Sequence, residues 1–458
     1  MKLSRSEVLR TTHTIPVIRF EDQALTSFSG LVIFQALFAK LNLKERLRWC
    51  FSHCTVSPIF GQHLIVLLLT VHLLLGYRWL RDSRYYRDDP MVKRLLGLER
   101  LPDVSTVSRS LLDADQRSVA RLAALIRRIV LEGLSILGLR RLTLDFDGSV
   151  QSTRRLAEGT AVGFNKKRKG DRSYYPLFCT VAQTGQVFAV LHRPGNVHDS
   201  RDAKAFVLRC IEEVRAALPG VRIEVRMDSA FFSDEIVTAL DDAGVEFTIS
   251  VPFERFVELK AMIEGRLRWR RFAPDLFFFQ TSWKPKSWEA RFRFLFIRQA
   301  VEIRQKEPIQ LDLFVPQQRG YDFKVIVTNK HTWVRQVVAF HNGRGAQEAI
   351  FAELKSQCQA DYVPVRGLIG NQIYLLCAVL AHNLTRALQM ETNPPQRNTT
   401  EKRSPLWIFQ ELSTIRRNLI QRAGRLIHPH GRLTLSMSAN PSVREELLHY
   451  LDALNVAA

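Results

Sequence analysis

The chain has 458 residues, with 66 Lys and Arg against 45 Asp and Glu, which gives a net charge of +21 at pH 7. The length allows two to four domains with a sizeable core, and the composition excludes a disordered or fibrous chain. The charge excess favours a polyanionic partner, with nucleic acid ahead of an acidic membrane surface, because no amphipathic anchor or lipidation signal is present.

The first segments contain neither a membrane span nor a secretion signal. The apolar run Leu64–Tyr77 is too short to cross a bilayer and predicts a buried helix. The N-terminus has no apolar signal core, so we expect a cytoplasmic protein, associated with the nucleoid when bound to DNA. Six scattered cysteines argue against a disulfide scaffold. Cys50–Cys54 resembles half of a metal site, but no second pair at zinc spacing accompanies it.

Residues 25–137 show a helical period, and 1–137 is predicted to be a helical N-terminal DNA-binding domain. Within it, "LGLERLPDVSTVSRSLLD" (96–113) predicts a helix, a turn and a second helix. If this pair docks on DNA in the helix-turn-helix manner, Ser105, Thr106 and Arg109 would contact it. An ordinary helical hairpin explains the pattern equally well.

From Arg140 the hydrophobic period changes to two. Three meandering strands are followed by alternating helices and strands up to Pro252, which predicts a mixed α/β sheet over 138–256. An aromatic, basic and alternating stretch then predicts a β-rich insertion over 257–320. One further strand and two helices complete the core over 321–392. The Pro-containing stretch 391–405 has the composition of a linker, and 393–458 is predicted to be a basic, mainly helical C-terminal segment.

Carboxylates fall at informative positions of this sheet. Asp145 and Asp147 lie two apart on the first strand and so share a face, where unpaired burial would be expensive. Asp228 ends a later strand, at the edge where open α/β sheets bind ligands. Alternatives stay open, since an aspartate also suits the turn at "DGS" and Asp228 could cap a helix.

The stretch "HNGRGAQEAIFAELK" places Arg344, Glu348 and Lys355 on one helical face. Alone, this stripe is more typical of a solvated ion-pair ladder. Together with Asp147 and Asp228, Glu348 would complete a set of three oxygen donors that suits Mg²⁺, with Mn²⁺ as an alternative. Two such ions could activate both oxygens of a phosphodiester exchange.

Several motifs resemble those of one enzyme family. "DFDGSV" resembles the first strand of the ribonuclease H fold, and "HNGRGAQEAIFAELK" resembles the Y-x2-R-x3-E-x6-K signature of a branch of bacterial DDE transposases, with His341 at the tyrosine position. The wider pattern is similar to the insertion-sequence thirteen-eighty group. The motifs that carry this similarity occur in the same order: "TSFSGLVIFQALFAKLNL", "LLGLERLPDVSTVSRSL", "GFNKKRKGDRSYYPLF", "RPGNVHDS" and "RMDSAFF".

The resemblance implies a ribonuclease H-like core that cuts transposon ends and joins them to target DNA. It implies that Asp147, Asp228 and Glu348 bind the catalytic metals, with Asp145 as the alternative first ligand. It also implies that Arg344 and Lys355 hold phosphates or orient the acids.

Two further features could bind DNA. The first is a basic loop that either clamps phosphates or forms a solvated hairpin arm, and its cations are Lys166, Lys167, Arg168, Lys169 and Arg172. The second is the pair Trp283 and Trp288, which could stack on an unpaired base or belong to the core of the insertion. Asn196–Ser200 could line the site, although a helix cap by Asp199 or Ser200 explains it equally well.

The sequence therefore predicts a Mg²⁺-dependent transposase that acts on double-stranded DNA, at transposon ends and target, as a homodimer or larger oligomer. A nuclease of the same fold that cuts without joining is one alternative. The other is a DNA-binding protein, descended from a transposase, that has no catalytic activity.

Overall fold

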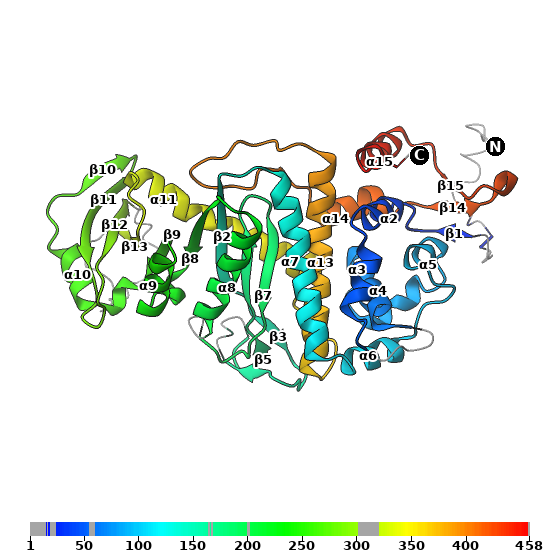
Figure 1. Ribbon diagram of the computed structural model, residues 1–458, viewed down its shortest axis with the longest axis horizontal. Coiled ribbons are helices and arrows are strands. Elements are labelled where there is room, and N and C mark those ends of the chain that lie inside the picture. Colours follow the sequence, from blue (N-terminus) through cyan, green and yellow to red (C-terminus); the bar gives the residue numbers. More distant parts are fainter. Residues whose placement is uncertain are drawn as a thin grey trace.

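The structure is a computed structural model that describes residues 15, 17–18, 24–54, 60–163, 165, 168–198, 202–300 and 320–456. Lys166, Lys167, Asp199 and Ser200 lie outside the described residues. Helices gather at one end of an elongated molecule, a large sheet occupies the rest, and α7 and α13 stand between them (Figure 1).

The N-terminal part is helical, as its period predicts. Aspartates begin three of its helices, because their carboxylates accept hydrogen bonds from free backbone N–H groups: Asp89 caps α5, Asp103 caps α6 and Asp115 caps α7. Gly97, at φ 74°, ends α5 in the left-handed conformation. The helices are α2 (Leu31–Lys40), α3 (Leu43–Cys50), α4 (Gln62–Leu74), α5 (Pro90–Leu96), α6 (Val104–Leu112) and α7 (Gln116–Ile136), with a 3₁₀ turn at Leu80–Tyr85.

Within the described residues, nine strands form one mixed sheet in the order β10-β11-β12-β13-β9-β8-β2-β6-β7. The centre is parallel, β2 with β8 and β8 with β9, and all other neighbours are antiparallel. The strands are β2 (Arg141–Gly148), β6 (Leu177–Val181), β7 (Gln186–Leu191), β8 (Arg222–Met227), β9 (Glu246–Val251), β10 (Arg270–Ala273), β11 (Leu276–Trp283), β12 (Phe292–Ala300) and β13 (Tyr321–Thr328). The predicted mixed α/β class is thus confirmed, and the strands expected in an insertion extend the core sheet.

Helices cover both faces of this sheet. Apolar residues of α8 (Ala203–Ala217), α9 (Asp234–Asp242) and α10 (Val257–Glu264) share one core with β2 and β8, while α11 (Val334–Asn342) packs on β12 and β13 from the other face. A small sheet of β3 (Gln151–Thr153), β5 (Arg172–Tyr174) and β4 (Ala161–Val162) follows β2. Beyond α11 come a 3₁₀ turn at Gly343–Gly345 and α12 (Ala346–Gln357).

Helix α13 (Leu368–Thr392) joins the two ends of the molecule. It contacts α4, α6, α7 and β7, and most of its residues are buried. Among the described residues it is the one helix long and apolar enough to cross a membrane, and here protein surrounds most of it.

The C-terminal part returns to both ends. Residues 393–411, which have a linker composition, run over the sheet (Figure 1), where the Leu406 amide donates to Gln183 O at 2.8 Å. After α14 (Leu412–Ile415), β14 (Gly424–Ile427) pairs with β1 (Leu25–Thr26) and with β15 (Thr434–Met437), and α15 (Pro441–Ala453) packs on α2 and α13. The division of the chain into five domains stays a prediction.

Candidate active site

Two of the predicted acids lie side by side at the carboxyl edge of the parallel pair. Strands β2 and β8 run in register up to Phe146 opposite Met227, so Asp147 and Asp228 follow on neighbouring strands. Neighbouring strands are about 5 Å apart. Leu142, Leu144 and Phe146 point into the core, so alternation places the aspartates of β2 on the other face.

Asp145 is an internal ion-pair partner. Its carboxylate accepts two hydrogen bonds from Arg226, one of them at 2.7 Å, and both side chains are buried. Arg226 also donates to the carbonyls of Phe340 at 2.9 Å and Lys402 at 2.7 Å. Burial raises the pKa of Asp145 more than Arg226 lowers it. On this face of the sheet Asp145 is thus paired with Arg226 inside the protein, while Asp147 and Asp228 lie at the partly exposed edge.

Arg344 links the last helices to Asp147. Its guanidinium donates to Asp147 Oδ2 at 3.0 Å, and the Gly148 amide donates to Asp147 Oδ1 at 2.8 Å. The adjacent Gln347 side chain donates to Asp145 O at 3.0 Å, which seats α12 on β2. These bonds explain why the Gly-rich turn and the first turn of α12 lie over this edge.

Asp228 is half-buried and lies near Arg344 and His198. Burial raises its pKa, whereas the charges of Arg344 and His198 lower it. Asp228 Oδ1 also accepts from the Ala230 amide at 3.0 Å, while Ser233 caps α9. Asp228 therefore caps the short turn that follows β8 and also lies at the edge next to Asp147.

Glu348 and Lys355 extend the same helical face. Glu348 is exposed in the first turn of α12, four residues after Arg344, where the helix dipole favours an ionised carboxylate. Lys355 is half-buried and lines a small hollow with Ser149 and Gln151, just beyond the end of β2. Both lie on the helix whose preceding turn contacts Asp147.

His341, at the tyrosine position of the signature, lies inside the protein. Its ring nitrogens are hydrogen-bonded to Thr248 Oγ1 at 3.1 Å and Ser250 Oγ at 2.9 Å. Burial and neighbouring cations keep the pKa of His341 well below its usual range. A neutral, buried imidazole braces α11 against β9 and does not face a phosphate.

The predicted DNA contacts on α6 lie on an accessible helix face. Ser105 and Arg109 are exposed, Thr106 is half-buried, and the Ser105 hydroxyl donates to Asp103 Oδ1 at 2.7 Å. Thr106 and Arg109 line a cavity of about 920 Å³ between helices. Their contact with DNA stays a prediction.

In the basic loop, Arg168 and Lys169 are exposed. Arg172 instead donates to Thr160, at the hydroxyl (2.9 Å) and the carbonyl, and so fixes the loop internally. A phosphate role for Arg172 would need these bonds to be exchanged.

The two tryptophans require a correction. Trp283 and Trp288 are each 6 % exposed, and the Trp283 indole donates to Glu258 at 3.0 Å. Trp283 packs edge-on against Phe294 and Trp288 packs on Phe232. They belong to the core between the sheet and α10, so neither is available to an unpaired base, and the core alternative is the right one.

Sequence reasoning missed Arg226, Gln347 and Lys324. Arg226 resembles an ordinary alternating strand residue, because its partner on β2 lies 81 positions earlier. Lys324 on β13 is close enough to Arg344 that burial and this charge lower its pKa to about 8. His198 was signalled only within the stretch Asn196–Ser200.

The edge fits hard divalent cations. Asp147 and Asp228 present two carboxylates at this edge, and Arg344 interacts with both. Glu348 follows Arg344 by four residues in the first turn of α12. Carboxylate oxygens are the preferred ligands of Mg²⁺ and Mn²⁺. Asp145 does not fit this role, since Arg226 already occupies both its oxygens.

Three solved transposase structures are among those similar to this chain. A piggyBac transposase synaptic complex with hairpin DNA is similar over 94 % of this chain and 85 % of its own, with 9 % identity and a TM-score of 0.43. A Mos1 transposase paired-end complex covers 42 % of this chain and 60 % of its own, with 9 % identity and a TM-score of 0.17. A Mos1 mariner paired-end complex with Mn covers 53 % and 70 %, with 11 % identity and a TM-score of 0.17.

None of the curated proteins matches this chain. The family model for transposase DDE domain group 1 matches residues 12–458, nearly the whole sequence. This chain therefore belongs to the DDE transposase family, group 1.

Proposed function

We propose that this protein is an active DNA transposase that binds the terminal inverted repeats of an insertion sequence, cuts the ends and joins them to target DNA. The observation that carries the proposal is the pairing of Asp147 and Asp228 on neighbouring strand ends with Arg344 bonded to Asp147. A similarity to the insertion-sequence thirteen-eighty group is consistent with it.

In this proposal Asp147, Asp228 and Glu348 hold Mg²⁺ or Mn²⁺. The ions would supply Lewis-acid stabilisation of the phosphodiester oxygens and an activated water. Arg344 orients Asp147 through its hydrogen bond, and its remaining donors can bind a phosphate. Lys355 adds a second cation on the same helix. Arg226 links Asp145 on β2 to the Phe340 carbonyl of α11, and Gln347 links α12 to β2, so both support the site without facing it.

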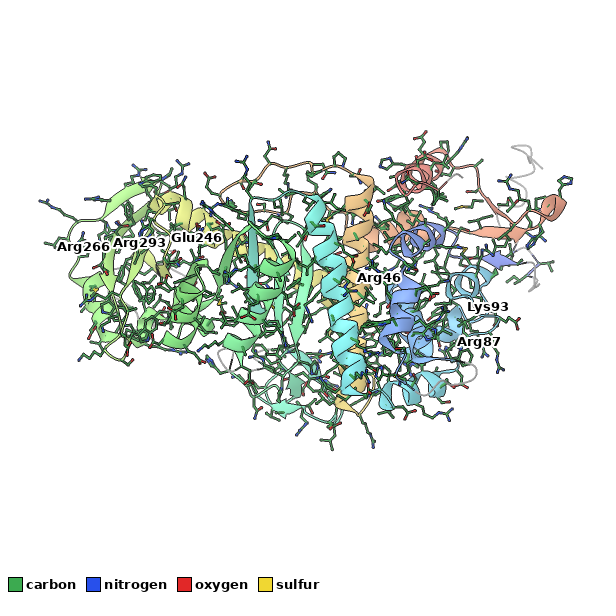
Figure 2. The ribbon with its side chains drawn as sticks, in the orientation of Figure 1. Arg46, Arg87, Lys93, Glu246, Arg266 and Arg293 are labelled. Carbon is green, nitrogen blue, oxygen red and sulfur yellow. The ribbon has the colours of Figure 1, made fainter. Side chains whose placement is uncertain are left out.

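Cationic side chains at both ends of the molecule support a double-stranded DNA partner. Arg46, Arg87 and Lys93 lie on the helical end, while Arg266 and Arg293 lie at the far end of the sheet (Figure 2). This spread, with the net charge of +21, suits a long duplex bound across the protein. Synapsis of two ends would require a homodimer or larger oligomer.

The test is incubation of the protein with DNA that carries the element's terminal inverted repeats, in Mg²⁺, with gel analysis of cleaved and joined products. Asp228→Asn can still accept the Ala230 hydrogen bond, so it should fold and bind DNA while cleavage falls at least about a hundredfold. Asp242→Asn, exposed at the end of α9, is the matched control and should retain activity. Binding without cleavage by the unaltered protein would refute the proposal, and cleavage without joining would identify a nuclease.

A further inference from the structure

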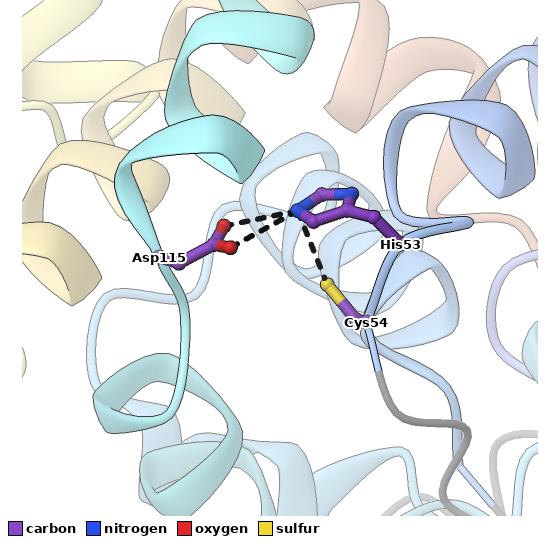
Figure 3. A group of neighbouring side chains, drawn as sticks. All are labelled: His53, Cys54 and Asp115. Carbon is purple, nitrogen blue, oxygen red and sulfur yellow. Dashed lines mark hydrogen bonds and ion pairs between the residues drawn. The ribbon is translucent and has the colours of Figure 1, made fainter.

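A second group of metal-binding side chains lies in the helical part, away from the acids of the sheet. His53 and Cys54 follow the end of α3, and Asp115 begins α7 (Figure 3). His53 Nε2 is 3.1 Å from both oxygens of Asp115 and 3.7 Å from Cys54 Sγ. One ligand atom from each residue lies within 4.8 Å of the others.

The crowding around His53 Nε2 is the first sign of a cation site. Ser118 Oγ also lies 3.4 Å from this nitrogen, so three side chains converge on it. A neutral imidazole nitrogen either carries one proton or accepts one, and so it satisfies one partner well. A cation between these atoms would satisfy a carboxylate, a thiolate and an imidazole together.

The spacing of these atoms is the second sign. Zinc binds nitrogen at about 2.0–2.1 Å and thiolate sulfur at about 2.3 Å, so tetrahedral geometry separates nitrogen from oxygen by about 3.3 Å and nitrogen from sulfur by about 3.5 Å. The observed separations are 3.1 Å and 3.7 Å. An oxygen is available as the fourth ligand, since Cys54 Sγ lies 3.2 Å from Gln62 Oε1 and 3.5 Å from Ser118 Oγ.

An entry path exists as well. His53, Cys54 and Asp115 line the cavity of about 920 Å³ that also contains Thr106 and Arg109 of α6. Asp115 is 53 % exposed on this side, while the His53 side chain is 10 % exposed. An ion can thus reach the cluster from solvent and bind against a mostly buried imidazole.

We propose that His53, Cys54 and Asp115 form a Zn²⁺ site. A borderline-soft ion is indicated because one ligand is a thiolate and one an imidazole. On binding, the Cys54 thiol loses its proton to solvent, and the His53 proton moves from Nε2 to Nδ1. No oxidation or reduction is involved. The site differs from the Cys50–Cys54 pair indicated by the sequence, because Cys50 is buried and its thiol donates to Arg121 O.

Arg121 should weaken metal binding, because its positive charge lies next to the His53 ring. Its Nη1 lies 3.2 Å from His53 Nδ1 and cannot accept the proton that a metal-bound ring carries there. The same Nη1 lies 3.2 Å from two other acceptors, Trp49 O and Ser52 Oγ, to which it can remain bonded. Arg121→Gln offers an acceptor for Nδ1–H and removes a positive charge, so it should tighten binding about tenfold or more.

Bound zinc would tie the end of α3 to the beginning of α7. Helix α6, with the predicted DNA contacts, ends just before Asp115 and lines the same cavity. The ion would therefore fix the orientation of α6 relative to α3. This inference does not depend on the catalytic proposal.

The experiment uses the full, untagged chain, stripped with a chelator and titrated with Co²⁺ in excess Mg²⁺. Mg²⁺ fills the carboxylate site, while a thiolate–Co²⁺ charge-transfer band reports Cys54. We expect one Co²⁺ per chain, displaced by Zn²⁺. Cys54→Ser and His53→Gln should abolish the band, whereas Cys50→Ala and the exposed His331→Gln should retain it.

Thermal unfolding keeps the test valid if a variant folds poorly. Zinc should raise the unfolding midpoint of the parent chain and of Cys50→Ala, but not that of Cys54→Ser, because a ligand stabilises only the state that binds it. Absence of the band in the parent chain, its persistence in Cys54→Ser, or its loss in well-folded Cys50→Ala would overturn the proposal.

Discussion

Replacing Arg226 with methionine keeps most of the side-chain volume but removes both hydrogen bonds to Asp145. Arg226 is fully buried and Asp145 is 2 % exposed, so water cannot replace the lost partner. The carbonyls of Phe340 and Lys402 lose a donor at the same time. Breaking one side of a buried ion pair costs about 3–5 kcal/mol, and we expect Arg226→Met to lower the free energy of unfolding by this amount near neutral pH.

The loss should depend on pH in a defined direction. The pKa of Asp145 is already raised by burial, and removing Arg226 raises it further. A carboxyl whose pKa is higher in the folded than in the unfolded state contributes stability below its unfolded pKa, about 4, and loses it as pH rises through the folded pKa. The free energy of unfolding of Arg226→Met should therefore be closest to that of the parent chain in acid, and the difference between them should grow as the pH rises.

The assay is urea unfolding followed by far-ultraviolet circular dichroism, for Arg226→Met, Asp145→Asn and the double variant. Each single change leaves an unpaired buried group. The free energy of unfolding that the double variant loses should therefore be clearly smaller than the sum of the losses of the two single variants. Exposed Arg266→Met is the matched control and should change the free energy of unfolding by less than about 0.5 kcal/mol. A cost below about 1 kcal/mol for Arg226→Met, or additive single losses, would refute the buried-pair argument.

Two further predictions concern residues that the sequence did not assign correctly. Lys324→Met should stabilise the chain near pH 7, and its advantage over the parent should shrink near pH 10. The reason is that the Lys324 pKa is lowered to about 8, so the parent loses stability as the pH falls through that value; an advantage independent of pH in urea unfolding would contradict this. Trp283→Ala should cost about 3–5 kcal/mol of unfolding free energy and leave DNA affinity of the folded protein unchanged. Exposed Trp333→Ala should be nearly neutral in the same measurements, and a Trp283→Ala variant of full stability with reduced DNA affinity would restore the stacking role.

The positions of the acids were predictable from local pattern. Period-two alternation placed Asp147 at a strand end, and the same reasoning placed Asp228 at another. Their adjacency was not predictable from pattern alone, because it depends on β2 and β8 being parallel neighbours in a particular register. The function of Asp145 was hidden for the same reason, since its partner Arg226 is found only across that pair.

Two environments that local composition does not reveal have a common physical origin. Trp283 ends a strand, and its neighbours "KPKS" indicate an exposed turn, yet α10 covers that strand end through Glu258. Residues 391–405 have a linker composition, yet Arg403 donates to the buried Glu224 at 2.9 Å. In both places the local composition is polar and suggests exposure, whereas a contact with an element distant in sequence makes the segment part of the packed structure.

The polar face of β8 explains why chemistry belongs at one edge of the sheet. Alternate residues Glu224, Arg226 and Asp228 share this face. Glu224 is fully buried, and burial alone would raise its pKa. Hydrogen bonds and charges from Arg403 and Lys330 outweigh burial and lower the pKa to about 2.

Charge pairing weakens in steps toward the carboxyl edge. Glu224 has several cations and Arg226 has a matched carboxylate, whereas Asp228 shares the influence of Arg344 with Asp147. Asp147 and Asp228 are only partly buried, so keeping their charges at the open edge costs less than burying them would. In the proposed reaction these two carboxylates would bind divalent ions, which in turn would contact the phosphates of DNA.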